Sequence, residues 1–141
     1  MVVVDGQGIP LGSTLASASP SEVKLIEATL DQVKVPRGGR GRPRKRMPRL
    51  IADKSYDSDP LRKRLKRQRG IDLICPHRRN RTKPRLQDGR KLRRYRRRFI
   101  IERTFAWLGA FRRLVVRWER LITVYRAFFH LACLMIALRQ L

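Results

Sequence analysis

Two acidic residues occupy positions where a carboxylate could hold a metal ion, and Asp53 is the first. It directly follows the short apolar run 50–52, which predicts a buried strand. Ligand-binding and catalytic side chains in open α/β sheets gather at the carboxyl ends of such strands. The alternative is a turn or capping aspartate, and position alone does not separate the two interpretations.

Glu102 is the second acidic residue, and it lies in a predicted helix over residues 92–115. At about 100° per residue, Tyr95, Arg98 and Glu102 fall within about 60° of one another on one helix face. An apolar stripe adjoins this face. The face therefore presents a phenol, a guanidinium and a carboxylate beside the core. The alternative is an ordinary i,i+4 ion pair between Arg98 and Glu102 on a solvated surface.

Short apolar strands and helices alternate along the chain and must position these residues. We expect strands at 2–4 and 9–18, a helix from 19, a strand at 50–52, a helix over 57–69, a strand at 71–75, and helices over 92–115 and 121–141. Ser19 or Ser21 can cap the first helix, and Gly70 can end the second. This order predicts a single α/β domain over 1–141, with a mixed sheet, flanking helices and two C-terminal helices.

The charge balance points to a polyanionic partner. The 141 residues carry 35 Lys+Arg against 11 Asp+Glu, a formal net charge of +24. Because arginine outnumbers lysine, and its fork suits phosphates and base edges, nucleic acid is favoured over an anionic membrane surface. The longest apolar stretch, 127–138, is too short to span a bilayer. Two cysteines give no disulfide framework and fit a reducing cytosol.

Two loops concentrate the positive charge, at 36–48 and 76–92. In the first, Arg40 and Arg42 belong to an R-G-R-P run that resembles the core of an AT-hook, a minor-groove binding motif. In the second, Arg78 and Arg79 could contact phosphates. The alternative for both loops is a solvated basic linker. We expect general contact with DNA rather than sequence recognition, because phosphate contacts carry little sequence information.

Three segments resemble those of a known family. Residues 52–57 read A-D-K-S-Y-D and closely resemble the region around the second catalytic aspartate of bacterial insertion-sequence DDE transposases. Residues 95–108 resemble the family's Y-x-x-R-x-x-x-E signature, and residues 4–11 are similar to a hairpin of these proteins. The segments occur in the same order as in the family, and the resemblance covers nearly the whole chain.

The resemblance implies an RNase H-like fold and metal-dependent cleavage and joining of DNA strands at transposon ends. It assigns Asp53 and Glu102 as two of three metal-binding carboxylates, with Mg²⁺ or Mn²⁺ as the ions, because these ions prefer oxygen ligands. It implies that Arg98 holds a phosphate or the carboxylate of Glu102, and that Tyr95 contacts the DNA end.

The sequence departs from the family pattern at two places. The family's signature often continues to a lysine seven residues after the glutamate, where this chain has Gly109. We expect Arg112 or Arg113 to supply that charge. The family's first catalytic aspartate lies on a strand before the opening hairpin. Asp5 falls in the predicted hairpin turn, so we do not assign it to the site.

We therefore expect a partial, truncated RNase H-like domain, the C-terminal part of a transposase that is inactive alone. Its expected partners are double-stranded DNA at transposon ends and target, an upstream transposase fragment, and a second copy in a homodimer. The expected location is the bacterial cytoplasm at the nucleoid, with no membrane contact. The alternative is a non-catalytic basic DNA-binding protein, a relic or an AT-hook-like module.

The aromatic residues of the C-terminal third could stack on unpaired bases, but core packing is the favoured interpretation. They are Trp107, Phe111, Trp118, Phe128 and Phe129. The final predicted helix is apolar around much of its circumference, so we expect part of it to be exposed and to promote association.

Overall fold

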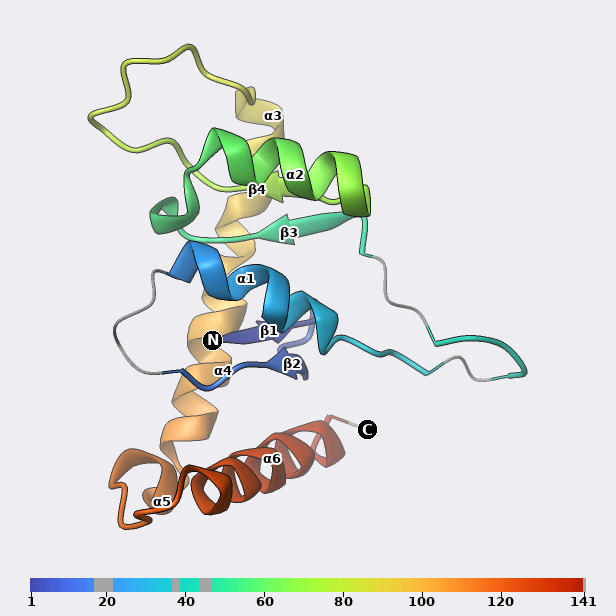
Figure 1. The fold of residues 1–141 in the computed structure, drawn as a ribbon, viewed down its shortest axis with the longest axis vertical. Coiled ribbons are helices and arrows are strands. Elements are labelled where there is room, and N and C mark those ends of the chain that lie inside the picture. The colour runs from blue at the N-terminus through green and yellow to red at the C-terminus, as the bar shows by residue number, and fades with distance from the viewer. Residues whose placement is uncertain (17–21, 37–38, 44–46, 141) are drawn as a thin grey trace.

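The computed structural model describes residues 1–16, 22–36, 39–43 and 47–140, and the expected first-helix caps and the end of the second strand lie outside these ranges. The α/β class predicted from the sequence is confirmed (Figure 1). The elements are β1 (Val2–Val4), β2 (Pro10–Ser13), α1 (Glu22–Asp31), β3 (Arg49–Ile51), η1 (Lys54–Tyr56), α2 (Asp59–Arg69), β4 (Asp72–Ile74), α3 (Gly89–Leu92), η2 (Arg93–Arg98), α4 (Phe99–Gly109), α5 (Arg112–Val115) and α6 (Ile122–Leu138).

The strands form two pairs. Strands β1 and β2 form the predicted antiparallel hairpin, in which Val3 lies opposite Gly12. Strands β3 and β4 are parallel, with Leu50 opposite Leu73. Among the described residues, β1 pairs only with β2, and β3 pairs only with β4. Each of the four strands therefore keeps one edge without a strand partner in this part of the chain.

The hairpin turn is fixed by Asp5 and docks on α4. The Asp5 carboxylate accepts hydrogen bonds from the backbone N–H groups of Gln7 (2.8 Å) and Ile9 (2.9 Å). The Thr104 hydroxyl donates to the carbonyl of Gly8 at 2.8 Å. Gly8 has a φ of +92°, and a Cβ there would lie 2.9 Å from Thr104 Oγ1. Glycine is therefore required where the hairpin meets the helix.

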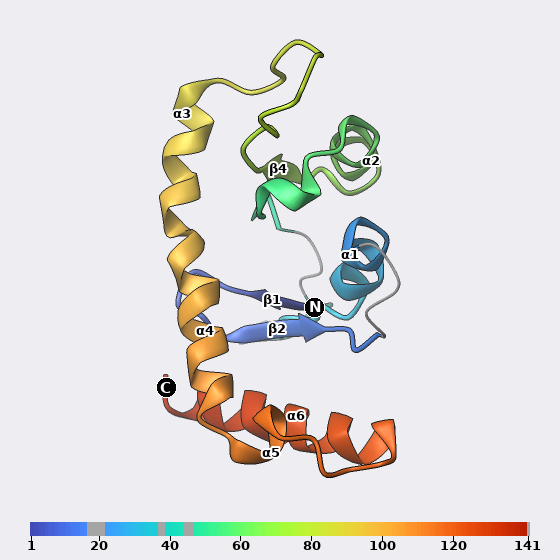
Figure 2. The ribbon, with the colours of Figure 1, turned by 90° about the vertical axis from the view of Figure 1, so that its left-hand side faces the viewer.

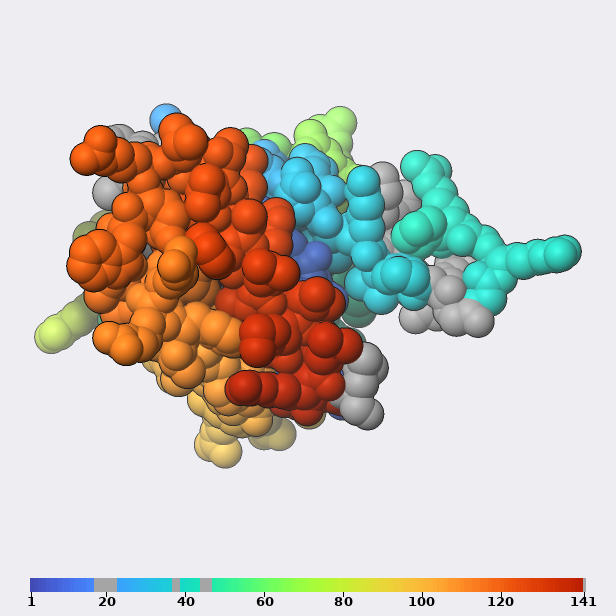
Figure 3. All heavy atoms as spheres, turned by 90° about the horizontal axis from the view of Figure 1, so that it is seen from below, coloured from blue at the N-terminus to red at the C-terminus, as the bar shows by residue number. Residues whose placement is uncertain are grey.

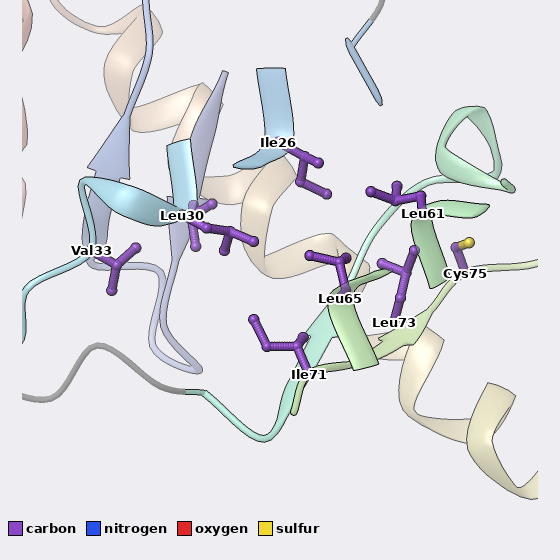
Figure 4. Close-up of a cluster of buried hydrophobic side chains, with 9 residues drawn as sticks. Ile26, Leu30, Val33, Leu61, Leu65, Ile71, Leu73 and Cys75 are labelled. Atoms are coloured by element: carbon purple, nitrogen blue, oxygen red, sulfur yellow. The ribbon is translucent and has the colours of Figure 1, made fainter. Parts of the chain in front are cut away.

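One buried cluster joins both strand pairs to α1 and α2 (Figure 4). Each member exposes less than a tenth of its surface to solvent. The members are Val3, Ile26, Leu30, Val33, Leu61, Leu65, Ile71, Leu73 and Cys75. Ile26 and Leu30 form the apolar face of α1 that enters this cluster, and Val33 joins it just after the helix ends. Removing this apolar surface from water is the main contribution that holds the two pairs together.

Helix α2 begins and ends at residues suited to those positions. Ser58 caps its first turn by accepting from the Leu61 N–H at 3.4 Å. Gly70 ends it in the left-handed conformation, with a φ of 68°, as predicted. The expected start at Asp57 was two residues early, because Asp57 closes the short helix η1 instead.

The predicted helix over 92–115 is correct in its middle and wrong at its ends. Helices α3, η2 and α4 form one nearly continuous column that starts at Gly89, after the capping residue Asp88 (Figure 2). The column ends at Gly109, and the chain turns before α5. Phe111 and Leu114 pack there against a second buried cluster, which explains the turn. That cluster consists of Leu108, Phe129, Ala132 and Ile136.

Helix α6 crosses the lower end of this column and has a second, exposed apolar face. Leu131, Leu134 and Leu138 are each more than half exposed, as the sequence predicted for part of this helix. The aromatic residues of this region differ in their burial. Phe129 is buried, but Trp118 is exposed, so the predicted core role of Trp118 was wrong. In the described residues, no helix is both long enough and apolar enough to cross a membrane.

Candidate active site

Asp53 lies where β3 ends and η1 begins. The Ala52 N–H donates to the Ile74 carbonyl at 3.0 Å, which ties this end of β3 to β4. The Asp53 carboxylate caps η1 by accepting from the Lys54 N–H at 2.6 Å. Its side chain nevertheless remains 46% exposed. The capping and ligand interpretations are therefore compatible, because an exposed carboxylate has oxygen lone pairs to spare.

Tyr95 and Arg98 approach Asp53 from η2. Residues three apart eclipse in a 3₁₀ helix, and the Arg98 guanidinium lies 5.7 Å from the centre of the Tyr95 ring. The Tyr95 hydroxyl donates to Asp53 Oδ1 at 3.3 Å. Partial burial, followed by the negative charge of Asp53, raises the pKa of Tyr95, so the phenol keeps its proton and acts as a donor.

Arg98 connects the two acidic residues that the sequence singled out. Its Nη1 lies 3.5 Å from Asp53 Oδ2, and its Nη2 lies 2.7 Å from Glu102 Oε1. Two C–N bonds of about 1.33 Å separate these nitrogens, so the two carboxylate oxygens lie within about 9 Å of each other. The pair is therefore more than an i,i+4 contact along one helix, because the same guanidinium also reaches the end of β3.

This arrangement holds two carboxylates around one positive charge. Without a cation, carboxylates this close would repel each other, and Arg98 offsets that repulsion. Both acids are accessible, and their oxygens are the ligand type that Mg²⁺ and Mn²⁺ prefer. Within the described residues, no group of three or more His, Cys, Asp or Glu side chains is placed to hold a metal ion. The described part of the chain thus offers two carboxylate ligands.

Another acidic residue, Asp57, lies at the end of η1 opposite Asp53, in a closed network of hydrogen bonds and ion pairs. Its side chain is 2% exposed and contacts Arg62 Nη2 at 3.0 Å, His77 Nδ1 at 2.9 Å and the Arg78 N–H at 2.8 Å. Burial alone would raise the pKa of Asp57, but the hydrogen bonds from Arg78, His77 and Arg62 outweigh it and lower that pKa. Asp57 therefore stays ionised as a structural anion.

Arg62 extends this network from α2 into β4. Its guanidinium donates to the Leu73 carbonyl at 2.9 Å and to the Cys75 carbonyl at 2.8 Å. The Gln87 side chain also donates to the Cys75 carbonyl. Burial raises the pKa of the Cys75 thiol to about 11, which makes it an unreactive core group. The sequence analysis missed Asp57 and Arg62, because only their burial distinguishes them from other charged residues.

The second basic loop is attached to this network at several points. Arg78 donates to the carbonyls of Ser55 (2.8 Å) and Lys54 (3.4 Å), so it holds the turn that follows Asp53. Arg81 makes a two-pronged contact with Asp59, with both N–O distances at 2.9 Å. Arg79 is exposed. The loop therefore places Arg78 beside the turn that follows Asp53.

The other predicted DNA-binding residues lie elsewhere. Arg40 and Arg42 are exposed in the irregular segment 39–43, on the opposite side of the molecule from η1 (Figure 1). Arg112 and Arg113 lie in α5, beyond the turn that ends α4. Arg113 contacts Glu119 at 3.2 Å. Helix α5 begins after the turn that ends α4, so it does not continue the helix that carries Glu102.

Comparison with known proteins identifies the family. Residues 1–137 match the family described as Transposase DDE domain. The chain is 37% identical over 135 residues to the protein assigned as the transposase of insertion sequence element IS402 from Burkholderia cepacia, an alignment that covers 96% of this chain. The chain spans 60% of the length of that relative. No solved structure matches this chain significantly. On the strength of the match over 1–137, the chain belongs to the DDE transposase family.

Proposed function

We propose that this chain acts in DNA transposition, with Asp53 and Glu102 as two of the carboxylates that hold the catalytic metal ions. The observation that carries this proposal is the bridge from Asp53 through Arg98 to Glu102. It joins a strand end and a helix that are far apart in sequence. Transposases of this family generally use divalent metal ions, and two accessible carboxylates fit that requirement.

Mg²⁺ or Mn²⁺ bound here would supply charge stabilisation and an activated water or 3′-hydroxyl for phosphodiester cleavage and strand transfer. The chain's own residues orient the reacting groups. Arg98 contacts both carboxylates and holds them close together, and its guanidinium suits a phosphate oxygen equally well. Tyr95, held as a hydrogen-bond donor beside Asp53, is placed to contact the DNA end.

The DNA would lie across the basic side chains near η1. Arg78 and Arg79 from the second loop would contact phosphates there, and Arg40 and Arg42 would extend the contact on the far side. A formal net charge of +24 supports strong, salt-dependent binding to double-stranded DNA. We propose that this binding occurs in the cytoplasm, at the nucleoid, where such DNA lies.

A third carboxylate would come from another segment. The chain spans 60% of its relative, and β1 and β3 each have an edge without a strand partner among the described residues. A two-stranded sheet is marginal alone, and a free edge accepts an added strand. An upstream fragment with an aspartate-bearing strand would complete an RNase H-like sheet and the metal site. The completed enzyme would then act as a homodimer on two transposon ends.

Metal binding by this chain tests the two carboxylates directly. We expect weak Mn²⁺ binding, measured by electron paramagnetic resonance, that is lost in Asp53→Asn and in Glu102→Gln. Asp31→Asn is the matched control, because Asp31 is an exposed acid paired with an arginine outside the site. Equal Mn²⁺ binding by all four proteins would refute the assignment.

DNA binding is tested separately from metal binding. Affinity for duplex DNA should fall steeply as the salt concentration rises, and it should be unchanged in the two carboxylate variants. If the chain binds DNA in this way but Mn²⁺ binding does not depend on Asp53 and Glu102, the protein is the non-catalytic DNA-binding alternative.

A further inference from the structure

Trp118 is the most exposed of the large apolar side chains that the structure describes, at 78%. It lies in the loop between α5 and α6, at the lower end of the α4 column. Tryptophan is usually well buried, because its large ring gains more than most side chains from leaving water. An indole displayed in this way is suited to contact a partner.

The loop that carries Trp118 is held in a defined shape. Arg117 donates to the Glu119 carbonyl at 3.1 Å and to the Arg120 carbonyl at 3.5 Å. The Arg117 guanidinium also lies 5.6 Å from the centre of the Tyr125 ring. On the other side, Glu119 is 7% exposed and pairs with Arg113 at 3.2 Å. The indole is therefore presented from a braced loop, which lowers the entropy lost on binding.

The charge around this loop selects the partner. Residues 112–126 contain one acid, Glu119, which is buried and already paired. The same segment contains the arginines Arg112, Arg113, Arg117, Arg120 and Arg126. A second copy of this chain, itself strongly positive, would be repelled here. A polyanion with flat apolar groups matches both the charge and the exposed ring, and nucleic acid has that chemistry.

We propose that Trp118 is a base-stacking residue of a second DNA-contact surface, formed by α5 and the α5–α6 loop. The arginines contact phosphates, and the indole receives an unpaired base. This inference rests on the proposed function, in that it requires the chain to bind DNA. The surface lies on the same side of the molecule as η1, at the opposite end of α4 (Figures 1 and 2), and Figure 3 shows it from below.

Stacking on Trp118 requires a base with a free face. Within a fully paired duplex, both faces of each base are covered by its neighbours, so an indole gains little there. A single strand, or a frayed or displaced strand end, offers the free face. The surface should therefore distinguish DNA with unpaired bases from fully paired DNA, while the phosphate contacts of its arginines serve both.

The experiment compares binding to a single-stranded oligothymidylate and to a fully paired duplex of the same length. We expect Trp118→Ala to weaken oligothymidylate binding about tenfold, which is typical of losing one aromatic platform, and to change duplex binding less than about twofold. Trp118→Phe should retain most of the affinity. The salt dependence should be unchanged in both variants, because no charge is removed.

Fluorescence gives an independent readout. The sequence contains two tryptophans, so Trp107→Phe leaves Trp118 as the only indole. We expect its emission to be quenched by oligothymidylate. Trp118→Ala should keep its far-ultraviolet circular dichroism and denaturation midpoint, because the side chain is exposed.

Normal oligothymidylate binding by Trp118→Ala would overturn the proposal, as would binding by Trp107→Phe without quenching. A change of oligomeric state with unchanged DNA affinity would also overturn it, because Trp118 would then lie in a protein interface. If neither oligonucleotide binds the wild-type chain, the proposed DNA-binding function is itself wrong, and this inference falls with it.

Discussion

The short helix η1 has an aspartate at each end, and the two aspartates differ in how far they are exposed to solvent. At the start of η1, Asp53 is 46% exposed and is contacted by the side chains of Tyr95 and Arg98. At its end, Asp57 is 2% exposed and is surrounded by Arg62, His77 and the Arg78 backbone. The region around Asp53 is an open face, and the region around Asp57 is a closed network.

The difference follows from the free energy of an ion in each place. A buried carboxylate is tolerated only when several donors replace the water that it loses. Those donors then cannot be exchanged for a metal ion or a phosphate. An exposed carboxylate keeps its hydration and can release one partner for another at small cost. We infer that the open face is available for chemistry and that the closed network keeps the open face in position.

The largest expected effect is on stability, in the closed network. Asp57→Ala leaves Arg62 buried without its carboxylate and should lower the free energy of unfolding by about 3–5 kcal/mol. Asp53→Ala loses the η1 cap and two partly exposed contacts, with Tyr95 and Arg98, and should cost about 1 kcal/mol. Urea denaturation of both variants measures this contrast, and equal losses would remove the distinction between the two regions.

Low pH should also destabilise the closed network, because it protonates Asp57. The folded-state pKa of Asp57 lies below its ordinary value of 3.8. Its contribution to stability is therefore fully present above that value and is lost as the pH falls through the lowered folded-state pKa. We expect the stability difference between the wild type and Asp57→Asn to shrink below pH 3.8. A difference that stays constant down to the acid transition would contradict the ionised state of Asp57.

Two neighbouring arginines of the second loop provide a matched pair with a smaller effect. Arg78→Ala removes the donors to the η1 carbonyls and should cost about 1 kcal/mol of unfolding free energy, whereas Arg79→Ala should stay within about 0.5 kcal/mol. Each variant should also lose about one phosphate contact with DNA. The slope of log affinity against log salt concentration should therefore become shallower by about one. If Arg79→Ala were the more destabilising change, the loop would not brace the turn as described.

The smallest stability effect is expected on the open face. Arg98→Gln removes two partly exposed ion pairs and should change the free energy of unfolding by less than about 0.5 kcal/mol. It also removes a cation that competes for the two carboxylates, so Mn²⁺ should bind more tightly. Weaker Mn²⁺ binding by this variant would mean that Arg98 matters more as a spacer than as a competitor.

Much of the local structure could be predicted from sequence. The hairpin, the Gly70 end of α2 and the placement of Asp53 after a strand depend on residues close in sequence, and the structure has all of them. The helical spacing of Arg98 and Glu102 also acts over a single turn, and their ion pair is present. The family motifs around Asp53 and Glu102 lie in segments that the sequence alone could align.

The sequence by itself therefore determined the family, the element types and the two candidate carboxylates, because capping, periodicity and motif spacing act over a few residues. Tertiary structure alone decided which charged residues are buried and that the Trp118 ring is exposed. Asp57 and Arg62 became a closed network, α4 ended at Gly109, and Trp118 faced solvent. Burial depends on contacts between distant segments, and the local pattern around a residue does not contain them.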